Sequence, residues 1–309
     1  MNDVVSIPAV CLLPLVIVAC RSPEAQRADR PGELVNRVTD AYPAYAPDGV
    51  SVAYMSNATG EFDIYVINSG AGTRRRLTDA PGQDGTPAWS PDGSRIAFRS
   101  MRDGHSQIYT MNADGSDQRN LSRNRWHDEH PFWSPDGERI LFTSRGRDPA
   151  DSTNFDLYDM RADGGDVRRI TATPEVETYA SWSPDGTRIV CRKVLSDGNW
   201  EVVVMDADGP NPHAVAPHPA VDGWPAWSPD GRRIAFTSER AGSEDLYVVE
   251  LVTGEVTRLT FDEARAERQA WWSPDGRSLV FARYTWFTGD PFYEAADLYT
   301  IGVSLEQSR

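Results

Sequence analysis

The chain has 309 residues, of which 39% are hydrophobic and 25% are charged, and this composition is typical of a globular protein rather than a disordered one. Its 46 acidic and 31 basic side chains give a net charge of −15, and Lys193 is the only lysine. This acidic balance excludes a nucleic-acid-binding protein, because phosphate contacts require clustered lysine and arginine.

The first twenty residues predict an export signal. The apolar run VVSIPAVCLLPLVIVAC is short for a bilayer span and ends in small residues. Its last four residues, IVAC at 17–20, resemble the lipobox of bacterial lipoproteins, and the resemblance implies that Cys20 is lipidated. A plain cleaved signal peptide is the alternative, since the basic segment that usually opens such signals is missing.

Residues 21–32, RSPEAQRADRPG, are polar and contain proline and glycine, so we expect a flexible tether. Cys11 and Cys20 both belong to the signal, which leaves Cys191 as the only cysteine of the folded body. The body is therefore predicted to contain no disulfide.

A five-residue motif recurs along the remainder of the chain. WSPDG occurs five times and YAPDG once, ending at Gly49, Gly93, Gly137, Gly186, Gly231 and Gly276, with spacings of 44, 44, 49, 45 and 45 residues. Each unit also contains short β-rich segments such as RIAF, DIYVI and RRLT, which gives four strands per unit and no helical period. These features predict an all-β, six-bladed propeller of four-stranded antiparallel blades over residues 33–303, followed by a C-terminal tail at 304–309.

The ends of the repeat predict how the ring closes. The last unit stops after DLYTI at 297–301 and has no RRLT segment, whereas VNRVT at 35–39 precedes the first unit. We expect the strand at 34–39 to pair with 297–303 and complete the last blade, because closure leaves no large exposed sheet edge.

The repeated pattern PxWSPDGxRIAFxS, with DIYxMNADG and RRLT after it, resembles the propeller of the TolB family of periplasmic proteins. The resemblance implies a six-bladed β-propeller over about residues 34–303. TolB proteins also have an N-terminal α/β domain, for which the tether at 21–32 leaves no room, and related propellers gate prolyl-oligopeptidase-like enzymes. The fold alone therefore does not assign the function.

The serine and aspartate of WSPDG are predicted to form a turn rather than a catalytic site. No G-x-S-x-G occurs and no histidine lies at a repeated position near the motif, so a serine nucleophile has no base. Proline, aspartate and glycine in this order are typical of a type I turn in a hairpin. We expect these turns to lie on the face of the propeller opposite the functional site.

Two columns of the repeat predict a binding surface. Five residues before the motif's aromatic residue, every unit is acidic: Asp40, Asp84, Asp128, Glu177, Asp222 and Glu267. Three residues before it stand Tyr42, Thr86, His130, Tyr179, Trp224 and Gln269. The acids either bond nearby backbone within each blade or form a negative ring at the channel mouth that attracts cations or basic peptide segments.

Two further clusters are candidate sites. HDEH at 127–130 places His127 and His130 around a carboxylate, which is either a polar loop or the beginning of a transition-metal site. The predicted loop at 284–296 contains Tyr284, Trp286, Phe287, Phe292 and Tyr293. Aromatic side chains beside a charged rim either cover a blade or form a binding surface.

The sequence as a whole favours an exported, monomeric, non-enzymatic module that binds a protein or peptide, possibly a basic or extended segment, at the acidic channel mouth. No cofactor is expected, and the membrane is reached only through a lipid anchor in the bacterial envelope. The alternatives are a metal-dependent lyase or hydrolase of acidic saccharides that uses His127 and His130, or an interaction scaffold without a channel ligand.

Overall fold

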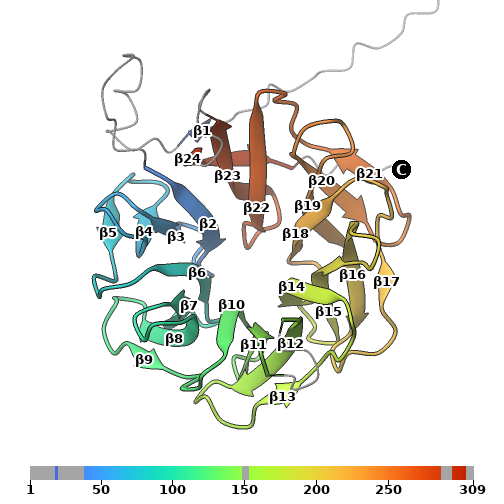
Figure 1. The fold of residues 1–309 in the computed structure, drawn as a ribbon. Coiled ribbons are helices and arrows are strands. Elements are labelled where there is room, and N and C mark those ends of the chain that lie inside the picture. The colour runs from blue at the N-terminus through green and yellow to red at the C-terminus, as the bar shows by residue number, and fades with distance from the viewer. Residues whose placement is uncertain (1–17, 20–37, 148–152, 287–293, 304–309) are drawn as a thin grey trace, which may run out of the picture.

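The protein is a ring of six β-sheets around a central axis (Figure 1). The computed structural model describes residues 18–19, 38–147, 153–286 and 294–303, so Cys20, the tether at 21–32 and the tail at 304–309 lie outside it. Each sheet has four strands, and all strand pairs within the sheets are antiparallel. The described residues contain no helix, and therefore none that is long and apolar enough to cross a membrane. The predicted six-bladed propeller is confirmed.

The strands take four radial positions in each sheet. The inner strands are β2 (Asp40–Tyr45), β6 (Asp84–Trp89), β10 (His127–Trp133), β14 (Val176–Trp182), β18 (Asp222–Trp227) and β22 (Arg265–Trp272). The second strands are β3 (Ser51–Ser56), β7 (Arg95–Ser100), β11 (Arg139–Arg145), β15 (Arg188–Val194), β19 (Arg233–Ser238) and β23 (Ser278–Trp286). The third strands are β4 (Asp63–Asn68), β8 (Gln107–Asn112), β12 (Phe155–Arg161), β16 (Trp200–Asp206), β20 (Asp245–Glu250) and β24 (Glu294–Gly302). The outer strands are β5 (Arg74–Arg76), β9 (Arg119–Asn120), β13 (Arg168–Arg169), β17 (His213–Ala214), β21 (Val256–Arg258) and β1 (Val18–Ala19).

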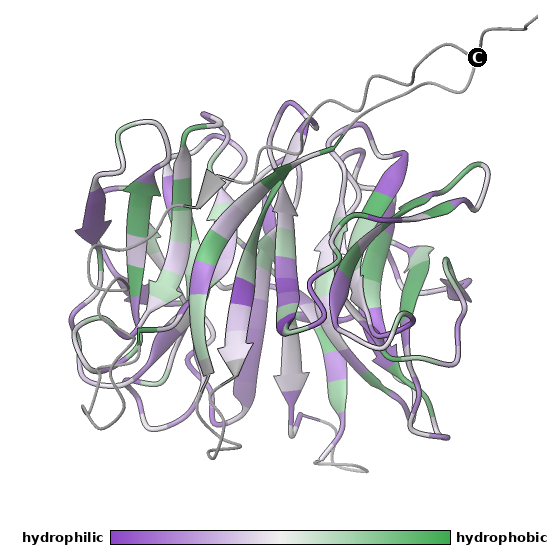
Figure 2. Ribbon diagram, turned by 90° about the horizontal axis from the view of Figure 1, so that it is seen from above, coloured by the Kyte–Doolittle hydropathy of each residue, from purple (hydrophilic) through white to green (hydrophobic). Residues whose placement is uncertain are grey.

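The hydrophobic core lies between neighbouring blades. The second strands have hydrophobic residues in succession because both of their faces are buried, and Figure 2 shows these stretches along the strands. Ile140 and Phe142 of β11 are fully buried and pack in one cluster with Ala97 and Ile108 of the preceding blade. Full burial of a side chain such as Phe142 contributes about 2–3 kcal/mol, so each interface between blades stabilises the ring.

The WSPDG motif forms the turn that joins each inner strand to the second strand. In the second blade, Ser90 Oγ donates to Asp92 Oδ1 at 2.6 Å and accepts the backbone N–H of Arg95, while the N–H of Gly93 donates to the carbonyl oxygen of Ser90. The glycine has a φ of 71°, in the left-handed region that lets the hairpin close. The predicted turn role of the motif is confirmed.

The six turns also interlock around the ring. Each motif glycine packs against the motif proline of the preceding blade. A Cβ atom added to the glycine would lie 3.7–3.9 Å from the proline ring. The last contact joins Gly49 of the first blade to Pro274 of the sixth. The motif therefore holds adjacent blades together as well as turning the chain.

The last sheet is completed by β1, which lies within the segment predicted to be an export signal. Val18 and Ala19 pair antiparallel with Thr300 and Tyr299 of β24. This places an N-terminal strand at the outer edge of the last blade, as the repeat predicts, but from an earlier part of the chain.

Of the predicted closing strand at 34–39, the structure describes only residues 38 and 39, and the outer position beside β24 is taken by β1. Residues 34–37 lie outside the described residues, and Thr39 forms an isolated parallel bridge with β24. The spacing explains the difference: Thr78 precedes Asp84 by six residues, which lets the chain cross from an outer strand to the next inner one. Thr39 directly precedes Asp40, the first residue of β2, and so has no such connection.

Candidate functional site

Each inner strand contains a β-bulge that turns one side chain toward the channel. The register shifts by one residue in all six inner strands. The residue at each bulge has φ between 48° and 60°: Tyr42, Thr86, His130, Tyr179, Trp224 and Gln269. Large or β-branched side chains rarely adopt this conformation, and such strain is concentrated at functional sites. The polar and aromatic column predicted from the sequence is therefore the set of bulge residues.

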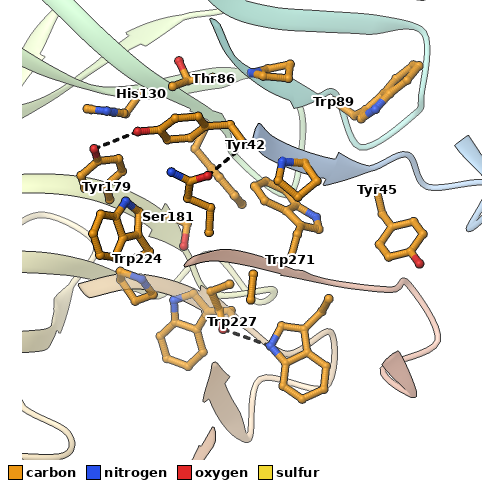
Figure 3. A pocket seen from close by; sticks show the side chains of 18 of the residues that line it. Tyr42, Tyr45, Thr86, Trp89, His130, Tyr179, Ser181, Trp224, Trp227 and Trp271 are labelled. Atoms are coloured by element: carbon orange, nitrogen blue, oxygen red, sulfur yellow. Dashed lines mark hydrogen bonds between the residues drawn. The ribbon is translucent and has the colours of Figure 1, made fainter. Parts of the chain in front are cut away.

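The bulge residues close the channel across its width. Tyr42 and Tyr179 come from opposite blades, and their hydroxyl oxygens lie 3.2 Å apart in a hydrogen bond (Figure 3). The His130 ring packs on Tyr179 with centroids 4.0 Å apart. Gln269 Oε1 accepts the N–H of Tyr42 at 3.1 Å and the hydroxyl of Tyr284 at 3.0 Å. We call the layer formed by the six bulge residues the floor.

A pocket of about 300 Å³ lies between the floor and the WSPDG turns. Its walls are mainly proline, alanine and aromatic side chains of the inner strands, and its rim includes Pro47, Pro91, Pro229 and Pro274 of the motifs. Phe132 and Trp271, also from opposite blades, meet in it with centroids 5.4 Å apart. The prediction that the motif turns lie away from the site is wrong for this pocket, because the turns form its mouth.

Several residues that line this pocket have a buried polar atom without a hydrogen-bond partner within the described structure. On the floor these atoms are Thr86 Oγ1, His130 Nδ1 and Trp224 Nε1; nearer the motif turns they are Ser181 Oγ and Nε1 of Trp89 and Trp227. Ser181 is only 5% exposed. Burial lowers the pKa of His130 to about 4, so its imidazole is neutral at physiological pH. Unsatisfied buried groups are costly, so a ligand that pairs with them would gain affinity.

Two arginines from second strands lie behind the floor. Arg192 places its guanidinium 4.6 Å from the centroid of Tyr179 and 4.3 Å from that of Trp200, and its Nε donates to Thr178. Arg99 lies beside Gly85, and its buried Nε has no hydrogen-bond partner. Among the described residues neither arginine forms an ion pair, and both contribute positive charge at the floor.

The acidic column lies inside the blades and does not form an exposed ring. All six carboxylates are 0–5% exposed. Five pair with a cation of their own blade at 2.8–3.2 Å: Asp84 with Arg102, Asp128 with Arg147, Glu177 with Lys193, Asp222 with Arg240, and Glu267 with Arg283. Burial raises the pKa of Asp40 to about 6 and that of Glu267 to about 7. The ring hypothesis is corrected: these acids bond within each blade, and the predicted channel-mouth attraction has no exposed carboxylates to produce it.

The two histidines of HDEH do not form a metal site in the described structure. His127 packs edge-on against His105, whereas His130 belongs to the floor. Across residues 38–147, 153–286 and 294–303, no three His, Cys, Asp or Glu side chains gather as metal ligands would. The segment is part of β10 rather than a loop.

The predicted aromatic loop at 284–296 is shorter in the structure, because β23 continues to Trp286 and β24 begins at Glu294. Tyr284 is 6% exposed and belongs to the core, bonded to Gln269 of the floor. Phe287, Phe292 and Tyr293 lie outside the described residues, so their predicted role stays a prediction.

Phe132, Trp271, Arg99 and Arg192 were not predicted as site residues, although each of them departs from the repeat in a recognisable way. Directly before the motif's aromatic residue, Ala44, Ala88, Ser181 and Ala226 are small, whereas Phe132 and Trp271 are large. In the second strands, Arg99 and Arg192 are the only charged members of a column that also contains Met55, Thr143, Thr237 and Ala282. Departures from a repeat thus mark the site better than agreement with it.

Comparisons with known proteins agree with the architecture. A family model described as the TolB β-propeller domain matches residues 34–152 and 181–287. No curated protein matches the chain. Among solved structures, TolB from Acinetobacter baumannii is 24% identical to this chain, with a TM-score of 0.66. The match covers 76% of this chain and 57% of that TolB, so this chain spans little more than half of that protein.

Two further structures have similar folds. A putative TolB from Agrobacterium tumefaciens is 20% identical with a TM-score of 0.65, over 86% of this chain and 91% of its own. An oligogalacturonate lyase in complex with manganese is 15% identical with a TM-score of 0.61, over 95% and 97%. At these identities the likeness concerns the fold, which unrelated functions share. Because the family model covers most of the repeat, the chain belongs to the TolB β-propeller domain family.

Proposed function

We propose that this propeller is a non-enzymatic module of the bacterial envelope that binds an extended segment of a protein or peptide in the pocket above the floor. The observation that supports this most is the combination of aromatic and proline walls with a floor of polar side chains, three of which have unpartnered buried atoms. Ligand pockets are usually apolar cavities with a few polar groups that orient the ligand.

The site favours binding over chemistry. Among the described residues that line it, the titratable ones are Tyr42, Tyr45, Tyr179 and His130, and none is a carboxylate, cysteine or lysine. Burial raises the pKa of Tyr42 and lowers that of His130, which keeps both groups neutral at physiological pH. Neutral donors and acceptors bind and orient a ligand without supplying a nucleophile.

Export with Cys20 as the lipidated residue is part of this proposal. Processing at that cysteine would remove β1 and leave β24 as the edge of the last blade. Mass spectrometry of the N-terminal peptide of the protein recovered from a bacterial envelope would test it: an acylated Cys20 supports processing, whereas an intact N-terminus refutes it.

Trp271→Ala tests the binding role. Alanine is the natural residue at the same position in three other blades, as Ala44, Ala88 and Ala226, so the ring tolerates it. The immobilised full-length chain is challenged with pools of randomised pentapeptides, and the retained peptides are counted by mass spectrometry. We expect retention by the wild-type chain and at least a tenfold loss in Trp271→Ala; equal retention by the two chains, or none by either, would refute the proposal.

A further inference from the structure

The floor gathers hydroxyl, imidazole, indole and amide groups at one end of the pocket, with two arginines behind it, and this arrangement specifies how a peptide would enter. We propose that the pocket holds the carboxy-terminal end of an extended peptide, with its free carboxylate at the floor and its last side chains between Phe132 and Trp271. This inference rests on the proposed peptide-binding function and adds the chemical group that the floor recognises.

The closed channel requires a chain end. The hydrogen bond between Tyr42 and Tyr179 joins opposite blades across the channel, so a peptide that enters from the WSPDG face cannot pass through. A cavity of about 300 Å³ is at the small end of ligand sites. A terminus of a few residues fits this space better than a loop, which needs room for two strands of chain.

The floor offers donors that suit a carboxylate. Trp224 Nε1 can only donate, and the hydroxyl of Thr86 can donate, yet neither has a partner in the described structure. The two hydroxyls of Tyr42 and Tyr179 hold two protons and share one in their mutual bond, so the second is free to point into the pocket. A carboxylate accepts several hydrogen bonds at once, and such charge-assisted bonds are stronger than neutral ones.

The charges behind the floor favour the carboxy terminus of a peptide over its amino terminus. Arg99 and Arg192 act electrostatically on the floor residue His130, and so does one acid, Glu129. The remaining nearby arginine, Arg268, is compensated by Glu244 at 2.5 Å. Two positive charges against one negative charge leave an excess that attracts a carboxylate and repels an amino terminus.

The walls favour a peptide over an acidic saccharide. Apart from Ser90 and Ser181, the lining above the floor consists of proline, alanine, tryptophan, tyrosine and phenylalanine. A sugar has hydroxyls on every side, and most of them would lose hydration here without gaining a partner. The last residues of a peptide have a carboxylate at one end and apolar side chains beside it, which matches the arrangement of the pocket.

Two matched pools of randomised pentapeptides test the inference on the full chain, one with free carboxylates and one with carboxamides. The wild-type chain should retain the free-acid pool at least ten times better than the amide pool. In Arg99→Thr/Arg192→Thr this ratio should fall to about one. Threonine is the natural residue at the matching positions 143 and 237, so the double variant should fold. Arg119→Thr, on an exposed outer strand, is the control for loss of positive charge and should keep the wild-type ratio.

Trp224→Phe keeps an aromatic ring at the floor and removes the N–H donor, so it should lower the ratio of free-acid to amide retention. Equal retention of both pools by the wild-type chain would overturn the carboxylate inference and leave the proposed function standing. Retention of neither pool would refute the proposed function itself. Retention of a uronic-acid trisaccharide in place of both pools, with the same dependence on Arg99 and Arg192, would assign the floor to an acidic sugar and overturn the peptide inference.

Discussion

Replacing Asp128 with asparagine should destabilise the propeller, because this carboxylate is fully buried and holds three donors. Its Oδ1 accepts from Ser144 Oγ at 2.5 Å, and its Oδ2 accepts from Asn124 Nδ2 at 2.7 Å and Arg147 Nη2 at 2.9 Å. An asparagine NH₂ would face at least one of these donors and leave Arg147 without a counter-charge. Removing one member of a buried ion pair costs about 3–5 kcal/mol, and we expect a loss of this size.

Urea denaturation of the wild-type chain and the Asp128→Asn variant measures this loss as the difference in the free energy of unfolding. Asp114→Asn is the control, because the Asp114 carboxylate lies on an exposed turn and accepts hydrogen bonds from Ser116. The unfolding free energy of this variant should hardly change. Asp128→Asn combined with Arg147→Met removes both charges and should recover part of the loss. An Asp128→Asn variant as stable as the wild type, yet deficient in peptide retention, would show that the acidic column contacts the ligand after all.

Three further predictions concern the titration of the column, the motif turns and the ring closure. Burial raises the pKa of Glu267 to about 7, above an unfolded value of 4.5, so the folded state binds the proton more tightly. Stability should therefore fall by at most about 3 kcal/mol as pH rises from about 4.5 to about 7. Urea midpoints measured at intervals across this range should depend less on pH in Glu267→Gln. Ser134→Ala removes the donor to Asp136 and should cost about 1–2 kcal/mol in urea denaturation, and no change would mean that the turn does not need its serine. A chain that starts at Cys20 lacks the two paired residues of β1 and should lose no more than about 2 kcal/mol; loss of most of the stability would mean that β1 is essential for ring closure.

The architecture could be predicted from the sequence because one turn recurs six times and each part of it has a physical role. Proline, aspartate and glycine specify the hairpin, the serine bonds the aspartate, and the glycine packs on the neighbouring proline. The strand β1 could not be predicted, because a two-residue outer strand has almost no sequence signal. The corresponding outer strand of the second blade, Arg119–Asn120, is equally short.

The acidic column did not predict the site, because an acidic residue repeated in every blade has two possible causes that look alike in the sequence. Six carboxylates at one position can face a ligand together, or each can solve the same local problem in its own blade. The structure has the second arrangement, in which Asp84 and Arg102 form a buried pair at 2.8 Å and Asp222 and Arg240 repeat it. The cations of these pairs follow the second strand, so they could be recognised only after the strand pairing was known.

The bulge column combines a regular backbone with irregular side chains, and this combination is what a binding site on a symmetric ring requires. A single ligand on the axis meets six blades at once, so it can be recognised only where the blades differ. The bulges turn six side chains of five kinds toward the axis, while the small residues before the motif leave space on four sides and Phe132 and Trp271 fill the other two. Bulges of this kind redirect side chains at the cost of backbone strain. The strain at Tyr42, Tyr179 and Trp224 is therefore best explained by the pocket that these side chains build.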